Sequence, residues 1–104
     1  MARKAHTLQQ QVGQLLIVGF DGTSISSKLR SELATLQPAG VILFRRNIED
    51  ALQTYNLVKD ARASVPTPMF HCIDLEGGTV DRLRDLIAPA PAAEAVYATG
   101  RKVI

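Results

Sequence analysis

Short apolar runs alternate along this chain with longer segments in which apolar residues recur at helical spacing. The apolar runs cover residues 15–20, 41–44 and 69–74, and each is rich in aliphatic or aromatic side chains. Short runs of this kind, bounded by turn and charged residues, are typical of buried β-strands. The pattern therefore predicts three strands, the first of which ends at the turn signal Asp21-Gly22.

The segments before and after the first strand are predicted to be helical. A short helix from Thr7 to about Val12 precedes the strand. A second helix follows it and carries three leucines on one face: Leu29, Leu33 and Leu36. Ser26 or Ser27 is a suitable N-cap for this helix, and Pro38 ends it.

Two further helices are predicted later in the chain. Apolar residues recur at helical intervals over residues 50–64, where Asn47 or Asp50 can accept hydrogen bonds from the first-turn amides and Pro66 follows the last turn. Residues 92–104 are rich in alanine and favour a helix, although Gly100 lowers the helix propensity of the last turn.

Three strand–helix units in succession predict an α/β fold with a parallel sheet, because a parallel neighbour is reached only through a crossover. Parallel sheets are normally covered on both faces. Three strands leave two edges unpaired, and the predicted helices are too few to cover both faces. We therefore expect the chain to be the opening portion of a larger α/β fold.

Composition and charge narrow the classes of function. With 46% hydrophobic and 21% charged residues, the 104-residue chain is typical of a globular protein and not of a disordered one. The net charge is only +2, the basic residues are scattered and 5% of residues are aromatic, so nucleic-acid binding is not expected. The pair Arg45-Arg46 is interpreted as a solvated or ion-paired loop. No metal-ligand spacing or phosphate-loop motif is present, and we expect neither metal nor cofactor.

The sequence predicts a cytoplasmic location. The basic start of the chain is followed by the polar run Gln9 to Gln11, which interrupts the apolar region that a secretion signal requires. The longest apolar stretches are far shorter than the ~20 residues that cross a bilayer, so no membrane span is expected. The single cysteine, Cys72, fits a reducing compartment.

The residues with the clearest potential for chemistry follow the third strand. Asp74 stands at the carboxyl end of that strand, where α/β folds gather ligand groups. An ionised carboxylate only accepts hydrogen bonds, which suits neighbouring sugar hydroxyls. The pair Gly77-Gly78 allows a sharp turn or a close approach of the backbone to a ligand. Arg82 and Arg84 are two residues apart, so one can point inward while the other meets solvent or an acidic neighbour.

Each of these residues also has a plain structural interpretation. A strand-terminal Asp often caps a helix or pairs with a cation, a Gly-Gly pair is often only a turn, and an Arg near acids usually forms a solvated ion pair. Strand alternation places Phe70 and Cys72 on the same face as Asp74, and His71 on the opposite face toward the helices. We interpret His71 as a packed or hydrogen-bonded residue, and Cys72 as an interior side chain without a nucleophilic role.

Three motifs, in this order and spacing, resemble the start of the family 3 glycoside hydrolases: QLLIVGFDGT at 14–23, GVILFRRN at 40–47 and DLEGGTVDRLR at 74–84. The likeness covers nearly the whole chain. The third motif is the most specific, and it is most similar to the β-N-acetylhexosaminidase branch, where it usually reads DQEGGRVQR. This chain departs from that pattern at three positions: Leu75, Thr79 and Asp81.

The resemblance implies a (β/α)8 TIM barrel, of which residues 1–104 would form the N-terminal portion with about three βα units. It also implies that Asp74 and Arg82 bind a terminal β-linked N-acetylglucosamine and that Glu76 is structural. The family's aspartate nucleophile and its histidine acid/base would lie outside this chain. No residue here is therefore assigned a catalytic role, and hydrolysis would require the remainder of the barrel.

The leading hypothesis is an N-terminal fragment of a retaining glycosidase that removes terminal N-acetylglucosamine in peptidoglycan recycling, with the fragment itself inactive. Two alternatives stay open. One is a stand-alone, non-catalytic module that binds sugar or another subunit. The other is a fragment of a family 3 β-glucosidase.

Overall fold

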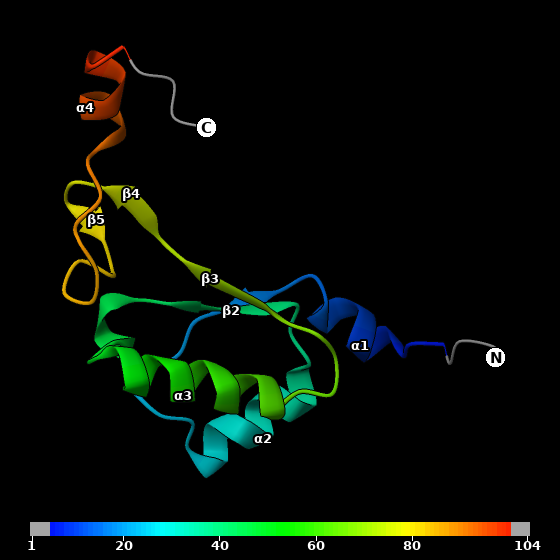
Figure 1. The fold of residues 1–104 in the computed structure, drawn as a ribbon. Helices are drawn as coiled ribbons and strands as arrows, with labels where there is room; N and C mark the ends of the chain where they lie inside the picture. Colours follow the sequence, from blue (N-terminus) through cyan, green and yellow to red (C-terminus); the bar gives the residue numbers. More distant parts are fainter. Residues whose placement is uncertain (1–4, 101–104) are drawn as a thin grey trace.

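The structure is a computed structural model, and it describes residues 5–100. Its centre is a three-stranded parallel sheet in the order β1-β2-β3 (Figure 1). The strands are β1 (Ile17–Val18), β2 (Gly40–Leu43) and β3 (Phe70–Ile73). Val41 is in register with His71, and Leu43 with Ile73. The expected parallel α/β arrangement is therefore confirmed.

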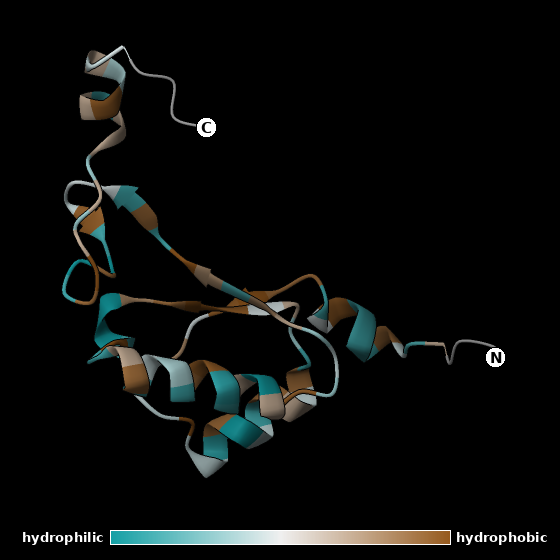
Figure 2. Cartoon of the chain, in the orientation of Figure 1, coloured by the Kyte–Doolittle hydropathy of each residue, from teal (hydrophilic) through white to brown (hydrophobic). Residues whose placement is uncertain are grey.

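Helices α2 (Ser27–Leu36) and α3 (Ala51–Ala63) connect the strands. Both lie on the same side of the sheet, whereas the short helix α1 (Leu8–Gly13) precedes β1 beside it (Figure 1). A single turn of 3-10 helix, η1 (Arg45–Asn47), leads from β2 toward α3. Figure 2 shows that α2 and α3 carry both hydrophilic and hydrophobic residues, as expected for helices with one face on a core.

The helix starts follow the capping residues of the sequence. The Thr7 side chain accepts a hydrogen bond from the Gln10 amide, and the Gln10 side chain accepts one from the Thr7 amide, which forms a capping box. Ser26, and not Ser27, caps α2. Asp50 caps α3, while Asn47 has a different role described below.

Helix α2 ends before the proline that was expected to stop it. The last helical residue is Leu36, and Gln37 adopts a left-handed conformation with φ of 48° that turns the chain toward β2. The Gln14 side chain donates a hydrogen bond of 2.9 Å to the Gln37 carbonyl. A Cβ on Gly13 would lie 2.0 Å from the Leu36 carbonyl oxygen, so only glycine permits the close approach of α1 to the end of α2.

The first strand is shorter than the apolar run that predicts it. Only Ile17 and Val18 pair with β2. The preceding residues continue the turn of α1, because the Leu15 amide donates to the Val12 carbonyl and the Leu16 amide to the Gly13 carbonyl. These local bonds compete with strand pairing, so Leu15 and Leu16 lie outside the strand, as do Gly19 and Phe20 after it.

The core lies between the sheet and the two helices. Val41 is 1% and Leu43 5% exposed, and both pack with side chains of α2 and α3, among them Leu33, Leu57 and Ala61. On the other face of the sheet Phe70 is 72% exposed. Within the described residues, no helix layer covers this second face (Figure 1).

The chain after β3 forms a hairpin, which was not predicted from the sequence. Strands β4 (Leu75–Gly77) and β5 (Val80–Asp81) pair antiparallel, and a short helix α4 (Ala93–Ala98) follows. The predicted helix over 92–104 is thus wrong at 99–100, where Gly100 has φ of 67°, and residues 101–104 lie outside the described residues.

The hairpin and α4 extend away from the three-stranded sheet (Figure 1). The radius of gyration is 17.0 Å, compared with about 13 Å for a compact domain of this length. The chain is therefore elongated. Among residues 5–100 we find no helix with the length and apolar character needed to span a bilayer.

Candidate functional site

Polar side chains gather where the parallel strands end. Asp21 follows β1, Arg46 follows β2 and Asp74 follows β3. Because the carboxyl ends of parallel strands meet at one edge of the sheet, this is the edge where α/β folds place ligand groups. The hairpin β4-β5 then brings Arg82 back toward Asp74. The structure thus places the two predicted sugar-binding residues together.

Asp74 and Arg82 form a loose, partly accessible ion pair. The Arg82 Nη2 atom lies 3.9 Å from Asp74 Oδ2, and the side chains are 29% and 49% exposed, respectively. This separation is longer than a hydrogen bond, so neither group consumes the hydrogen-bonding capacity of the other. The carboxylate can still accept, and the guanidinium can still donate, to a polar ligand. That this ligand is a sugar stays a prediction.

Two guanidinium groups contact the ring of Phe44. Arg46 Cζ is 4.9 Å and Arg82 Cζ is 5.9 Å from the ring centroid, both within the range of a cation–π contact. Arg46 is in turn held by Asp21, with 3.0 Å between Nε and Oδ1. The ring therefore links the loop after β1 to the Asp74–Arg82 pair.

The pair Arg45-Arg46 is ion-paired, as expected from the sequence. Arg46 pairs with Asp21, and Arg45 pairs with Asp85 from the segment after β5. Both arginines are half-exposed, which is typical of a solvated loop and not of a nucleic-acid surface.

Asp81 is a structural residue that sequence reasoning missed. Its side chain belongs to a residue that is only 3% exposed, where Oδ1 accepts from the Leu83 amide and Oδ2 from the Ala90 amide, each at 3.0 Å. One carboxylate thus holds both ends of the segment that follows Arg82. The Asp-x-Leu turn is a local signal for the first bond, but nothing in the sequence indicates the second, which spans nine residues.

The pair Gly77-Gly78 lies close to the backbone of residues 90–91. Both residues have positive φ, at 75° and 58°, which favours glycine. A Cβ on Gly77 would lie 2.0 Å from the Pro91 carbonyl oxygen, and the Gly78 amide donates to the Ala90 carbonyl. The pair therefore makes a sharp turn and lets residues 90–91 pack on the hairpin. Glu76 is exposed in β4.

Asn47 joins the loops after β1 and β2, which the sequence did not reveal. Its side chain is completely buried and donates to the Phe20 carbonyl at 3.0 Å and to the Gly22 carbonyl at 2.7 Å. Its Oδ1 atom accepts from the Phe44 amide at 2.9 Å. These three bonds fix the backbone on both sides of Asp21 and at Phe44.

His71 packs toward the helices, in agreement with strand alternation. Burial lowers the pKa of its imidazole, and the nearby Arg62 of α3 lowers this pKa further. In the described part of the chain its Nε2 atom is buried without a hydrogen-bond partner. The histidine is therefore a packed residue of the covered face. Cys72, its neighbour in β3, is a free thiol.

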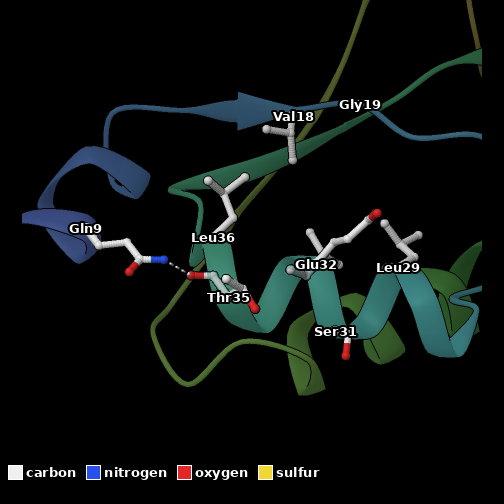
Figure 3. A pocket seen from close by; sticks show the side chains of 9 residues that line it. Gln9, Val18, Gly19, Leu29, Ser31, Glu32, Thr35 and Leu36 are labelled. Atoms are coloured by element: carbon white, nitrogen blue, oxygen red, sulfur yellow. Dashed lines mark hydrogen bonds between the residues drawn. The ribbon is translucent and has the colours of Figure 1, made fainter.

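A separate pocket lies between β1 and α2, away from Asp74. It is lined mainly by apolar side chains, including Val18, Leu29 and Leu36, with Gln9 and Glu32 at its rim (Figure 3). The Gln9 side chain donates to the Thr35 carbonyl across one end. An apolar groove of this kind does not suit a sugar, whose hydroxyls need many polar partners.

The residues from 5 to 100 hold no cluster of His, Cys, Asp or Glu able to bind a metal ion. The polar groups at the strand ends instead alternate in sign, with carboxylates beside guanidinium groups. Such an edge can bind a neutral polyhydroxyl ligand through both donors and acceptors.

Residues 7–102 match the glycosyl hydrolase family 3 N-terminal domain. The chain therefore belongs to this family of glycoside hydrolases. It is 39% identical over 88 residues to a beta-hexosaminidase from Xanthomonas campestris, an alignment that covers 82% of this chain and 27% of that protein. A beta-hexosaminidase from Stenotrophomonas maltophilia is 36% identical over 88 residues, with 82% and 26% covered.

The chain is also similar to solved structures of other proteins. The chain is similar to a family 3 beta-N-acetylglucosaminidase from a Paenibacillus species, with a TM-score of 0.86, 34% identity, and coverage of 93% of this chain and 19% of that one. It is also similar to NagZ from Neisseria gonorrhoeae in complex with N-trifluoroacetyl-D-glucosamine, with a TM-score of 0.61, 25% identity, and coverage of 70% and 21%. The chain thus spans about a quarter of the length of the curated relatives it matches.

Proposed function

We propose that this chain forms the first part of a family 3 glycosidase barrel that removes terminal β-linked N-acetylglucosamine. Its three parallel strands would supply about three of the eight strands of a (β/α)8 barrel. The open edges of the sheet, its uncovered second face and the elongated shape support this assignment. The relatives reported are named as enzymes, which favours a glycosidase over a stand-alone binding module.

The observation that carries the proposal is the Asp74–Arg82 pair at the carboxyl end of β3. Its 3.9 Å separation and partial exposure leave acceptors and donors available to adjacent hydroxyls of one sugar. The position at a strand end is where barrel enzymes bind substrate. A similar solved structure holds an N-acylated glucosamine, which supports an N-acetylated sugar as the ligand here.

The proposed role of these two residues is binding, and the chemical step needs further groups. Retention of configuration at the glycosidic carbon requires a nucleophile and an acid/base on the two sides of the scissile bond. We assign neither to this chain. Purified alone, the 104-residue chain is expected to show no turnover of an aryl N-acetyl-β-glucosaminide, and measurable turnover would overturn this division of roles.

The test uses a chimera in which this chain replaces the matching segment of the Xanthomonas campestris beta-hexosaminidase. The chimera supplies the remainder of a barrel from a relative 39% identical to this chain. It is expected to hydrolyse an aryl N-acetyl-β-glucosaminide, and Asp74→Ala is expected to lower kcat/KM by about 100-fold or more, as the loss of charge-assisted hydrogen bonds predicts.

The matched control is Asp60→Ala, which removes an exposed aspartate near the C-terminal end of α3. Its kcat/KM should stay within twofold of the unmodified chimera, roughly the scatter expected for a surface change. Equal kinetics for Asp74→Ala and Asp60→Ala would withdraw the binding site. A folded but inactive chimera would withdraw the proposed activity.

Substrate preference is tested on the same chimera with paired aryl N-acetyl-β-glucosaminide and aryl β-glucoside. Preference for the glucoside would favour the β-glucosidase alternative. We further propose that the natural substrate is a cell-wall muropeptide recycled in the cytoplasm, a setting with which the free thiol of Cys72 is compatible. Release of N-acetylglucosamine from purified muropeptides by the chimera is the corresponding assay.

A further inference from the structure

Few polar contacts fix the guanidinium of Arg82. Its carboxylate partner Asp74 is 3.9 Å away, beyond hydrogen-bond distance. Its Nε atom is buried and has no hydrogen-bond partner among the described residues. Fixing a long, flexible side chain in one rotamer costs conformational entropy. Since the polar contacts of Arg82 are few, an additional contact is needed to offset this cost.

That contact is the ring of Phe44. Arg82 Cζ lies over the ring at 5.9 Å from its centroid. A cation is attracted to an aromatic face by the ring quadrupole, and this attraction uses none of the N–H donors of the guanidinium. The outer Nη donors of Arg82 therefore stay available, which a hydrogen-bonding neighbour would not allow.

The ring itself is fixed from several sides. The Phe44 amide donates to the fully buried Asn47 side chain. Arg46 Cζ lies 4.9 Å from the ring centroid and is anchored by Asp21. A Cβ on Gly19 would lie 3.2 Å from Phe44 Cε2, so the ring rests close to the backbone at the end of β1. A ring fixed in this way can support the Arg82 guanidinium in one position.

We propose that Phe44 is a positioning residue that holds the Arg82 guanidinium beside Asp74 with its Nη donors free for the substrate. The proposal rests on the proposed function, because it assumes that Arg82 binds the sugar. Phe44 itself touches neither the sugar nor the reacting atoms. Its contribution acts on substrate binding through Arg82 and should therefore change KM more than kcat.

The first test is Phe44→Leu in the chimera, which keeps apolar bulk and removes the ring. KM for the aryl N-acetyl-β-glucosaminide should rise about fivefold, in line with a partly desolvated cation–π contact, while kcat changes by less than about twofold. Phe44→Tyr keeps the ring, so its KM should equal that of the unmodified chimera. The matched control is Tyr55→Leu, which removes an exposed aromatic ring of α3 and should leave both constants unchanged.

Two further measurements separate positioning from a merely structural role. In an Arg82→Met background, Phe44→Leu should cause no additional rise in KM, because the ring then has no cation to hold. Incorporation of 3,5-difluorophenylalanine at position 44 weakens the ring quadrupole with little change of shape, and should raise KM about twofold without lowering Tm. The fluorinated variant gives a result even if Phe44→Leu does not fold.

The outcomes are distinct. An unchanged KM in the difluorophenylalanine variant, or effects of Phe44→Leu and Arg82→Met that simply add, would overturn the positioning role while leaving the proposed function intact. An Asp74→Ala chimera with normal kinetics would instead remove the sugar site, and with it the basis of this inference.

Discussion

The two faces of the three-stranded sheet have opposite environments. On the covered face Val41 and Leu43 are enclosed by Leu33 and Leu57 of the two helices. On the open face the large ring of Phe70 is mostly exposed. Both faces are apolar, which is the composition of a parallel sheet with a layer on each side. Within the described residues, helices α2 and α3 supply packing partners for one face only, and the other face stays exposed.

The largest expected effect compares the two faces directly. Leu57→Ala removes a fully buried side chain and should lower the free energy of unfolding of the chimera by about 2–5 kcal/mol, measured by urea denaturation. In the chimera Phe70→Ala should cost about 3 kcal/mol, because a completed barrel encloses that ring.

Leu57→Ala and Phe70→Ala can also be compared in the 104-residue chain alone. There Leu57→Ala should increase the rate of limited proteolysis strongly, whereas Phe70→Ala should change it little because the ring is already exposed. A Phe70→Ala chimera as stable as the unmodified one would contradict the inference that the open face becomes covered.

The next prediction concerns the three side-chain hydrogen bonds of Asn47, which connect the loops after β1 and β2. Asn47→Ala removes three hydrogen bonds from a completely buried position and leaves their backbone partners unpaired. The expected loss in the free energy of unfolding is about 2–3 kcal/mol. Asn56→Ala, an exposed asparagine of α3, is the matched control and should cost less than about 0.5 kcal/mol. Similar decreases in the free energy of unfolding for both variants would show that the Asn47 hydrogen bonds do not stabilise the fold.

A smaller effect is expected in the hairpin outside the sheet. Gly77→Ala and Gly100→Ala both place a side chain at positive φ, but only at Gly77 would the Cβ meet the Pro91 carbonyl oxygen. Gly77→Ala should therefore lower the unfolding free energy by about 1–2 kcal/mol more than Gly100→Ala does. Equal values in thermal denaturation would mean that the close approach of Pro91 is unimportant.

The smallest expected effect is a pH dependence on the covered face. Burial lowers the pKa of His71 in the folded state below its ordinary value of 6.5, so the unfolded state binds more protons below pH 6.5. The unfolding free energy of the chimera should therefore fall as the pH drops below 6.5, and level off below the folded pKa. His71→Gln should remove this component, whereas His6→Gln at an exposed position should not. An unchanged slope in His71→Gln would contradict the assignment.

Local features of the sequence determined most of the fold. The capping side chains of Thr7, Ser26 and Asp50 mark the helix starts, because a cap bonds to amides only three residues away. Apolar runs located β2 and β3, since continuous burial in a parallel sheet needs such runs. The motif after β3 indicated both the family and the residues Asp74 and Arg82.

The tertiary structure decided what depends on contacts distant in sequence. The pairing of β4 with β5, which brings Arg82 to Asp74, was not predicted from the sequence. Its glycines pack closely against the later segment at 90–91, a contact that local sequence does not indicate. The roles of Asn47 and Asp81 likewise depend on backbone groups brought near by folding. Short-range propensity carries no information about such partners, and burial then makes their hydrogen bonds obligatory.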